Sequence, residues 1–77
     1  MYLDASRSRL SDSDLELLNR VPSVSRLDLD NTSITDAGLV HLHGLWNLQI
    51  LDLTGTNVSD DAVAALQRAL PDCRMRR

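Results

Sequence analysis

The chain of 77 residues contains no lysine and no phenylalanine, and only one cysteine, one tryptophan and one tyrosine. A single cysteine, Cys73, excludes an intramolecular disulfide and any multi-cysteine metal cage. No apolar run approaches the ~20 residues that a membrane-spanning helix needs. No basic segment followed by an apolar stretch marks a secretory signal. These absences predict a cytoplasmic protein that has no membrane partner.

Acidic residues outnumber basic ones by eleven to eight, which makes the net charge −3. Residues 68–77 contain four arginines and one aspartate, so the excess of negative charge lies in the rest of the chain. Nucleic-acid binding needs a basic face, and the acidic body therefore argues against nucleic acid as a partner. Because 43% of the residues are hydrophobic, we expect one small folded domain over residues 1–77.

Similar residues recur every 24 positions along the chain, and Leu3, Leu27 and Leu51 form one such set. Further sets in the same register are Asp4, Asp28 and Asp52; Ser8, Thr32 and Thr56; Leu10, Ile34 and Val58; Ser11, Thr35 and Ser59; Asp12, Asp36 and Asp60; Leu15, Leu39 and Val63; and Leu18, Leu42 and Leu66. A fixed period of this length is typical of one supersecondary unit per repeat, stacked into a solenoid. We expect about three repeats, at 3–26, 27–50 and 51–75.

Each repeat is expected to contain a short strand, a polar turn and a helix. The stretches 27–29 and 51–53 alternate apolar and polar residues, which favours a strand with one buried face. The hydroxyl sets have two expected roles, since a hydroxyl before a helix acts as an N-cap and one in a turn bonds the backbone. The expected caps are Ser11, Thr35 and Ser59, and the expected turn hydroxyls are Ser8, Thr32 and Thr56. The carboxylates of Asp12, Asp36 and Asp60 are expected to face free N–H groups at the helix entrances.

Residues 48–60, Leu-Gln-Ile-Leu-Asp-Leu-Thr-Gly-Thr-Asn-Val-Ser-Asp, resemble the leucine-rich repeat pattern L-x-x-L-x-L-x-x-T-x-I-T-D-x-G-L-x-x-L. The resemblance extends over nearly the whole chain. It implies an α/β fold: a right-handed solenoid with short parallel strands on the concave face and helices on the convex face. It also implies a role in recognition, the binding of a protein or peptide on the concave sheet.

In such a sheet, residues 24 positions apart would stack on neighbouring strands at a spacing of roughly 4.8 Å. Asp4, Asp28 and Asp52 would then form a ladder of carboxylates, which Asp30 widens. A stripe of this kind predicts a basic partner protein or peptide. The alternative is a solvated face on which nearby arginines limit the repulsion between like charges.

The neighbouring outward column consists of Tyr2, Arg26 and Ile50. An aromatic ring, a guanidinium and an aliphatic side chain on one face are favoured at interface centres. Ile50 has the alternative of packing against the turn before its strand. Trp46, the lone tryptophan, is a candidate hot-spot residue for a partner, and its alternative is a ring that covers a repeat boundary.

A competing hypothesis is self-association. The first strand, with Leu3 and Ala5, has no polar capping element ahead of it and would leave an open sheet edge. Arg76 lies 24 positions after Asp52, so it could extend the aspartate column towards Asp4 of a second copy and form a homo-oligomer. This register holds only if the last repeat has 24 residues and not 25. The same difference decides whether Cys73 points inward or lies in a turn. A fragment of a longer repeat array is a further alternative.

No catalytic, cofactor-binding or metal-binding residues are predicted. The three glycines are isolated, so no glycine-rich phosphate loop exists. His41 and His43 are two positions apart in an expected helix, which points them to different sides, unlike a metal-binding pair at i and i+4.

Overall fold

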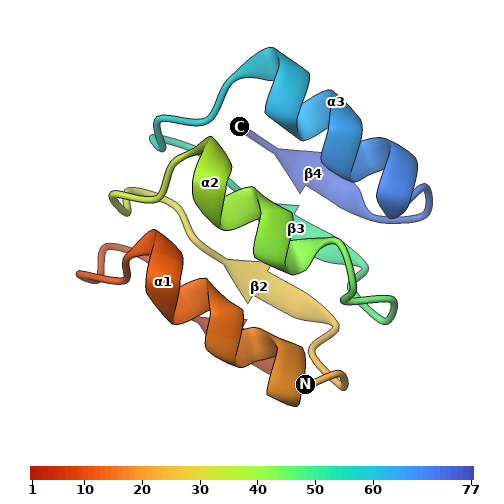
Figure 1. The fold of residues 1–77 in the computed structure, drawn as a ribbon. Coiled ribbons are helices and arrows are strands. Elements are labelled where there is room, and N and C mark those ends of the chain that lie inside the picture. The colour runs from red at the N-terminus through yellow and green to blue at the C-terminus, as the bar shows by residue number, and fades with distance from the viewer.

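Helices cover one face of a four-stranded parallel sheet in the computed structural model, which describes residues 1–77 (Figure 1). The strands are β1 (Tyr2–Asp4), β2 (Arg26–Asp28), β3 (Ile50–Asp52) and β4 (Arg74–Arg76). The helices are α1 (Asp12–Leu15), continued by the 3₁₀ helix η1 (Glu16–Arg20); α2 (Asp36–Leu39), continued by η2 (Val40–Leu42); and α3 (Asp60–Ala69). The predicted α/β class is therefore confirmed.

The strands lie in chain order, β1-β2-β3-β4, and every neighbouring pair is parallel. Leu3, Leu27, Leu51 and Met75 are aligned in one row across the sheet, each 24 residues after the last. The sequence predicted only the first three of these strands. The fourth forms because Met75, half-buried between two exposed arginines, continues the apolar row of the inner face.

One cluster of fifteen buried apolar side chains fills the space between the sheet and the helices. It includes Cys73, so of the two alternatives for this residue the inward one is correct. Cys73 is buried just before β4 as Leu48 is buried just before β3, and the two residues are 25 positions apart. The paired residues of β3 and β4 are nevertheless 24 positions apart. The helix α3 differs from its two predecessors, since it is α-helical over ten residues and has no 3₁₀ continuation.

The turn hydroxyls form the bonds expected of them. Thr32 Oγ1 donates to the carbonyl oxygen of Leu29 at 2.7 Å, three residues back in the chain. The corresponding hydroxyls of Ser8 and Thr56 do the same at 2.6 Å. Each hydroxyl therefore closes the turn that leads its strand away from the sheet.

Ser11, Thr35 and Ser59 all lie at the N-cap position with extended backbone, as expected. Only the Ser59 hydroxyl caps its own helix, since it accepts from the amide of Ala62 at 3.2 Å; the hydroxyls of Ser11 and Thr35 form no such bond, and the expected capping role is wrong for them. The aspartates that follow them have a different role from the one expected. The carboxylate of Asp36 accepts from both the amide N–H and the hydroxyl of Ser59, each at 2.7 Å, and so joins α2 to the start of α3. Asp12 joins α1 to Thr35 in the same way, at 2.7 and 2.6 Å. These carboxylates therefore connect neighbouring helices and do not bond the N–H groups of their own helix.

Replacing Asp36 with asparagine is expected to lower the urea midpoint of unfolding at pH 7, because one of the two oxygens that bond Ser59 is lost. The hydrogen bonds from Ser59, its amide first, hold the pKa of Asp36 below its usual value. A lowered folded-state pKa contributes stability above the unfolded value of about 3.9, and this stability is lost as the pH falls through the folded value. The difference between wild type and variant should therefore shrink below about pH 4.

Asp72 is exposed and forms no side-chain hydrogen bond, so Asp72→Asn is the matched control and should leave the midpoint nearly unchanged at both pH values. If Asp36→Asn lowered the urea midpoint by the same amount at neutral and acidic pH, the ionised carboxylate would have no stabilising role.

Three residues 24 positions apart share a left-handed backbone conformation: Arg7 (φ 55°), Asn31 (φ 57°) and Gly55 (φ 75°). Glycine adopts this conformation without steric cost and asparagine tolerates it. Arg7 is therefore the one position of the set that is occupied by an unfavourable residue.

Replacing Arg7 with glycine is expected to raise the free energy of unfolding by about 0.5–1 kcal/mol. Relief of the left-handed strain, about 1–2 kcal/mol, exceeds the entropy that glycine adds to the unfolded chain, about 0.4–1 kcal/mol. Thermal unfolding followed by circular dichroism measures the effect. Arg9→Gly removes the same charge at a residue without positive φ and should be destabilising; stabilisation by both variants would point to charge as the cause.

Candidate functional site

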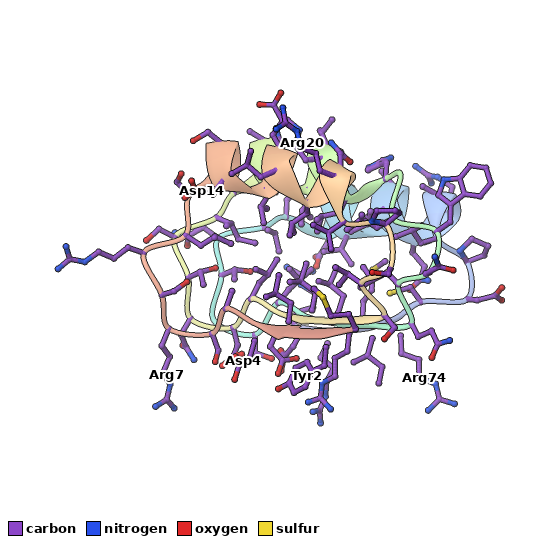
Figure 2. The ribbon with its side chains drawn as sticks, turned by 90° about the horizontal axis from the view of Figure 1, so that it is seen from below. Tyr2, Asp4, Arg7, Asp14, Arg20 and Arg74 are labelled. Atoms are coloured by element: carbon purple, nitrogen blue, oxygen red, sulfur yellow. The ribbon has the colours of Figure 1, made fainter.

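The face of the sheet that points away from the helices, called here the outer sheet face, consists of two columns of side chains. The first is Tyr2, Arg26, Ile50 and Arg74, and the second is Asp4, Asp28, Asp52 and Arg76. Figure 2 shows Tyr2, Asp4 and Arg74 on this side, together with Arg7, while Asp14 and Arg20 lie on the helix side. The six residues predicted for the two columns therefore lie on one face. Asp30 follows β2 and is half-buried at its end.

Asp28, at the centre of the aspartate ladder, is only 7% exposed. Its Oδ2 accepts from the hydroxyl of Tyr2 at 2.6 Å, and its Oδ1 from Nε of Arg26 at 3.3 Å. The guanidinium carbon of Arg26 lies 4.6 Å from the centre of the Tyr2 ring, a cation–π arrangement. Because Tyr2 donates to a carboxylate, the pKa of Tyr2 is raised. Asp28 is thus covered and bonded on both oxygens by its neighbours.

The other two ladder carboxylates bond residues of their own turns. Asp4 Oδ1 accepts from the hydroxyl of Ser6 at 2.5 Å and from its amide at 3.0 Å. Asp52 Oδ1 accepts from the hydroxyl and amide of Thr54 at 2.7 and 3.0 Å. These hydrogen bonds, the hydroxyl ones first, lower the pKa of Asp4 and of Asp52, and Arg76 lowers that of Asp52 further. Both groups are therefore ionised at neutral pH.

A shallow pocket of about 260 Å³ lies on the outer sheet face above β2, β3 and β4. It is lined by Arg26, Asp28, Ile50, Asp52, Arg74 and Arg76. Ile50 is half-buried here, so it contributes apolar surface between charged groups. Arg74 was not among the residues predicted from the sequence, although it follows Ile50 by the same 24 positions that relate Ile50 to Arg26.

Trp46 lies in the loop between η2 and β3 and is 86% exposed. A ring this exposed covers no boundary between units, so that alternative is wrong. Trp46 borders a second pocket, of about 200 Å³, with Leu48, Ala69, Leu70, Pro71, Asp72 and Cys73. No residue is shared between this pocket and the one on the outer sheet face, so Trp46 does not line the same pocket as the other predicted binding residues.

The residues predicted for an assembly edge lie at opposite ends of the sheet. Leu3 and Ala5 are half-buried at the β1 edge, and Arg76 lies in β4 at the other edge. The register places Arg76 beside Asp52, as the 24-residue spacing requires. Arg77, next in the chain, forms an ion pair with Asp60 and donates to the carbonyl oxygen of Val58 at 2.9 Å.

No three histidine, cysteine, aspartate or glutamate side chains are grouped so that they could hold a metal ion. Cys73 is buried, and burial raises the pKa of its thiol. None of the helices combines the length and the apolar character that crossing a membrane requires.

The chain matches no protein-family model, no curated protein and no solved structure.

Proposed function

We propose that the chain is a leucine-rich-repeat solenoid of about three repeats, and that its outer sheet face binds a protein or peptide without catalysis, in the cytoplasm. The observation that supports this best is the composition of that face. Tyr2, Arg26 and Ile50 put an aromatic ring, a guanidinium and an aliphatic side chain in one column. Arg26 and Ile50 also line the pocket of about 260 Å³.

The size of the molecule favours a peptide or a small patch of a partner protein. The strands contribute only two outward side chains each, eight in all, whereas a standard interface involves about 20–30 residues on each side. An extended segment fits such a face, since a few residues at about 3.4 Å each cross its whole width. A catalytic role of Cys73 is disfavoured, because a buried thiol with a raised pKa provides little thiolate.

Selection from a random peptide library on the immobilised chain tests this function. Amide chemical shifts of the labelled chain with a selected peptide should change along Tyr2, Arg26 and Ile50. Ile50→Ser should weaken binding about tenfold or more, whereas Val40→Ser, an exposed apolar position on the helix layer, should not. Shift changes confined to the helix layer, or no peptide enriched over an unrelated protein, would overturn the proposed function.

A second candidate function is self-association through the sheet edges, favoured by two observations. The apolar side chains Leu3 and Met75 are only half-buried at the two edge strands. In the register of the sheet, Arg76 of one copy would lie beside Asp4 of the next, and such a head-to-tail contact need not close. Light scattering over a concentration series should then show oligomers that Arg76→Glu disrupts and Arg9→Glu does not. A monomer at every concentration would exclude this candidate.

A further inference from the structure

The charged groups of the outer sheet face differ in whether they already have partners. All three ladder carboxylates accept hydrogen bonds within the chain: Asp4 from Ser6, Asp28 from Tyr2 and Arg26, and Asp52 from Thr54. Each of these bonds satisfies part of the acceptor capacity that a basic partner would need. The aspartate ladder is therefore less available to a partner than its charge alone suggests.

The arginines of β4 have no hydrogen-bonded partner in the chain, although Arg76 lies beside Asp52 in the sheet. The guanidiniums of Arg74 and Arg76 form no hydrogen bond and no ion pair, and both side chains are exposed. Arg26 differs from them, since it is paired with Asp28. Around the pocket, this pairing leaves Arg74 and Arg76 against the single carboxylate of Asp52. The net charge of the pocket lining is therefore positive, although the whole chain has a net charge of −3.

Arg74 and Arg76 alternate with the inward-facing Met75, so they project from the same side of β4. Residues two apart in a strand are separated by roughly 6.6 Å. An extended partner segment repeats its side chains on one side at that same spacing. A guanidinium forms two parallel hydrogen bonds with a carboxylate, and the two arginines can therefore each bind one of two alternate acidic residues.

We propose that the β3–β4 half of the outer sheet face binds an extended acidic segment of a partner protein, with carboxylates at residues i and i+2 bound by Arg74 and Arg76. Ile50 supplies the apolar floor of the pocket beside them. Asp52 lies in β3, between β2 and β4. Its carboxylate repels the acidic side chains of the segment, which keeps them away from β2 and over β4. This inference rests on the proposed function, that the outer sheet face binds a peptide, and specifies the chemistry of the partner.

Three fluorescein-labelled peptides in one serine–glycine background test the proposal by fluorescence polarisation. The first has two glutamates at alternate positions, the second has the same two glutamates adjacent, and the third has two lysines at alternate positions. We expect the alternate-glutamate peptide to bind most tightly and its affinity to fall with salt. Arg74→Gln and Arg76→Gln should each weaken it about tenfold, as for loss of a charge-assisted hydrogen bond.

Arg20→Gln is the matched control, because Arg20 lies on the helix side in Figure 2 and should leave the affinity unchanged. Equal binding of the adjacent-glutamate peptide would overturn the proposed spacing. If the alternate-glutamate peptide binds no more tightly than the lysine peptide, the inference is wrong. Lysine-peptide binding that Asp4→Asn weakens would overturn this inference while the peptide-binding function stands. The function itself fails only if library-selected peptides do not bind the outer sheet face.

Discussion

Replacing Leu51 with alanine is expected to lower the free energy of unfolding by about 2–5 kcal/mol, the range for removing a buried leucine side chain. Leu51 is fully buried, and in the sheet it lies between Leu27 on one side and Met75 on the other. Truncation would leave a cavity at the centre of the row that joins all four strands. A domain of 77 residues has a total stability of roughly 4–12 kcal/mol, so the variant loses a large part of it.

Urea unfolding followed by far-ultraviolet circular dichroism measures this loss. Tryptophan fluorescence is a poor probe here, since Trp46 is 86% exposed in the folded chain. Leu17→Ala is the matched control: Leu17 is 58% exposed on the helix layer, and its truncation should change the stability by no more than about 0.5 kcal/mol. Equal losses for the two variants would mean that the row through Leu51 is not the centre of the core.

Gly38→Ala should destabilise the protein by about 1–3 kcal/mol, the usual cost of forcing an extra methyl group into a packed site. Helix propensity predicts the opposite sign, since alanine is favoured over glycine by about 0.5–1 kcal/mol within a helix. A Cβ at Gly38, in α2, would lie 2.9 Å from Cδ1 of Leu15 and would also overlap the carboxylate of Asp12. That carboxylate bonds the amide and hydroxyl of Thr35, so the methyl group would separate α1 from α2.

Gly44→Ala provides the comparison for Gly38→Ala. A Cβ at Gly44 would meet only the side-chain oxygen of Asn19, at 3.9 Å, which is ordinary contact. This variant should therefore change the stability by less than about 0.5 kcal/mol. Thermal unfolding measures the change in stability of both variants. A stabilised Gly38→Ala protein would show that α1 and α2 can move apart without cost.

Much of the fold could be predicted from the sequence because the relevant forces act between residues close in the chain or at one fixed spacing. The recurrence of leucine every 24 residues predicted the register of β1, β2 and β3. The hydroxyls Ser8 and Thr32 bond carbonyls three residues away, so a local pattern was enough to assign them. The same locality explains why the positions of the three N-caps were predicted, although only the hydroxyl of Ser59 bonds an amide of its own helix.

The candidate site was predicted only in part. Alternation along each strand put Tyr2, Arg26 and Asp28 on the outer face, as observed. Alternation does not show that the tyrosine and the arginine both bond the aspartate and bury it. Arg74 was missed because the last segment departs from the leucine pattern, although the 24-residue spacing pointed to it.

Other features depend on atoms that approach each other only after the units have stacked. The bonds from Asp12 to Thr35 and from Asp36 to Ser59 join neighbouring helices, so no single helix sequence predicts them. The exposure of Trp46 and the unpartnered arginines of β4 likewise depend on what lies beside each side chain in space. Periodicity predicts which face of the sheet or helix a residue occupies. Whether two side chains form a hydrogen bond or overlap depends on differences of a few tenths of an ångström in the distance between their atoms, and only the packed structure provides those distances.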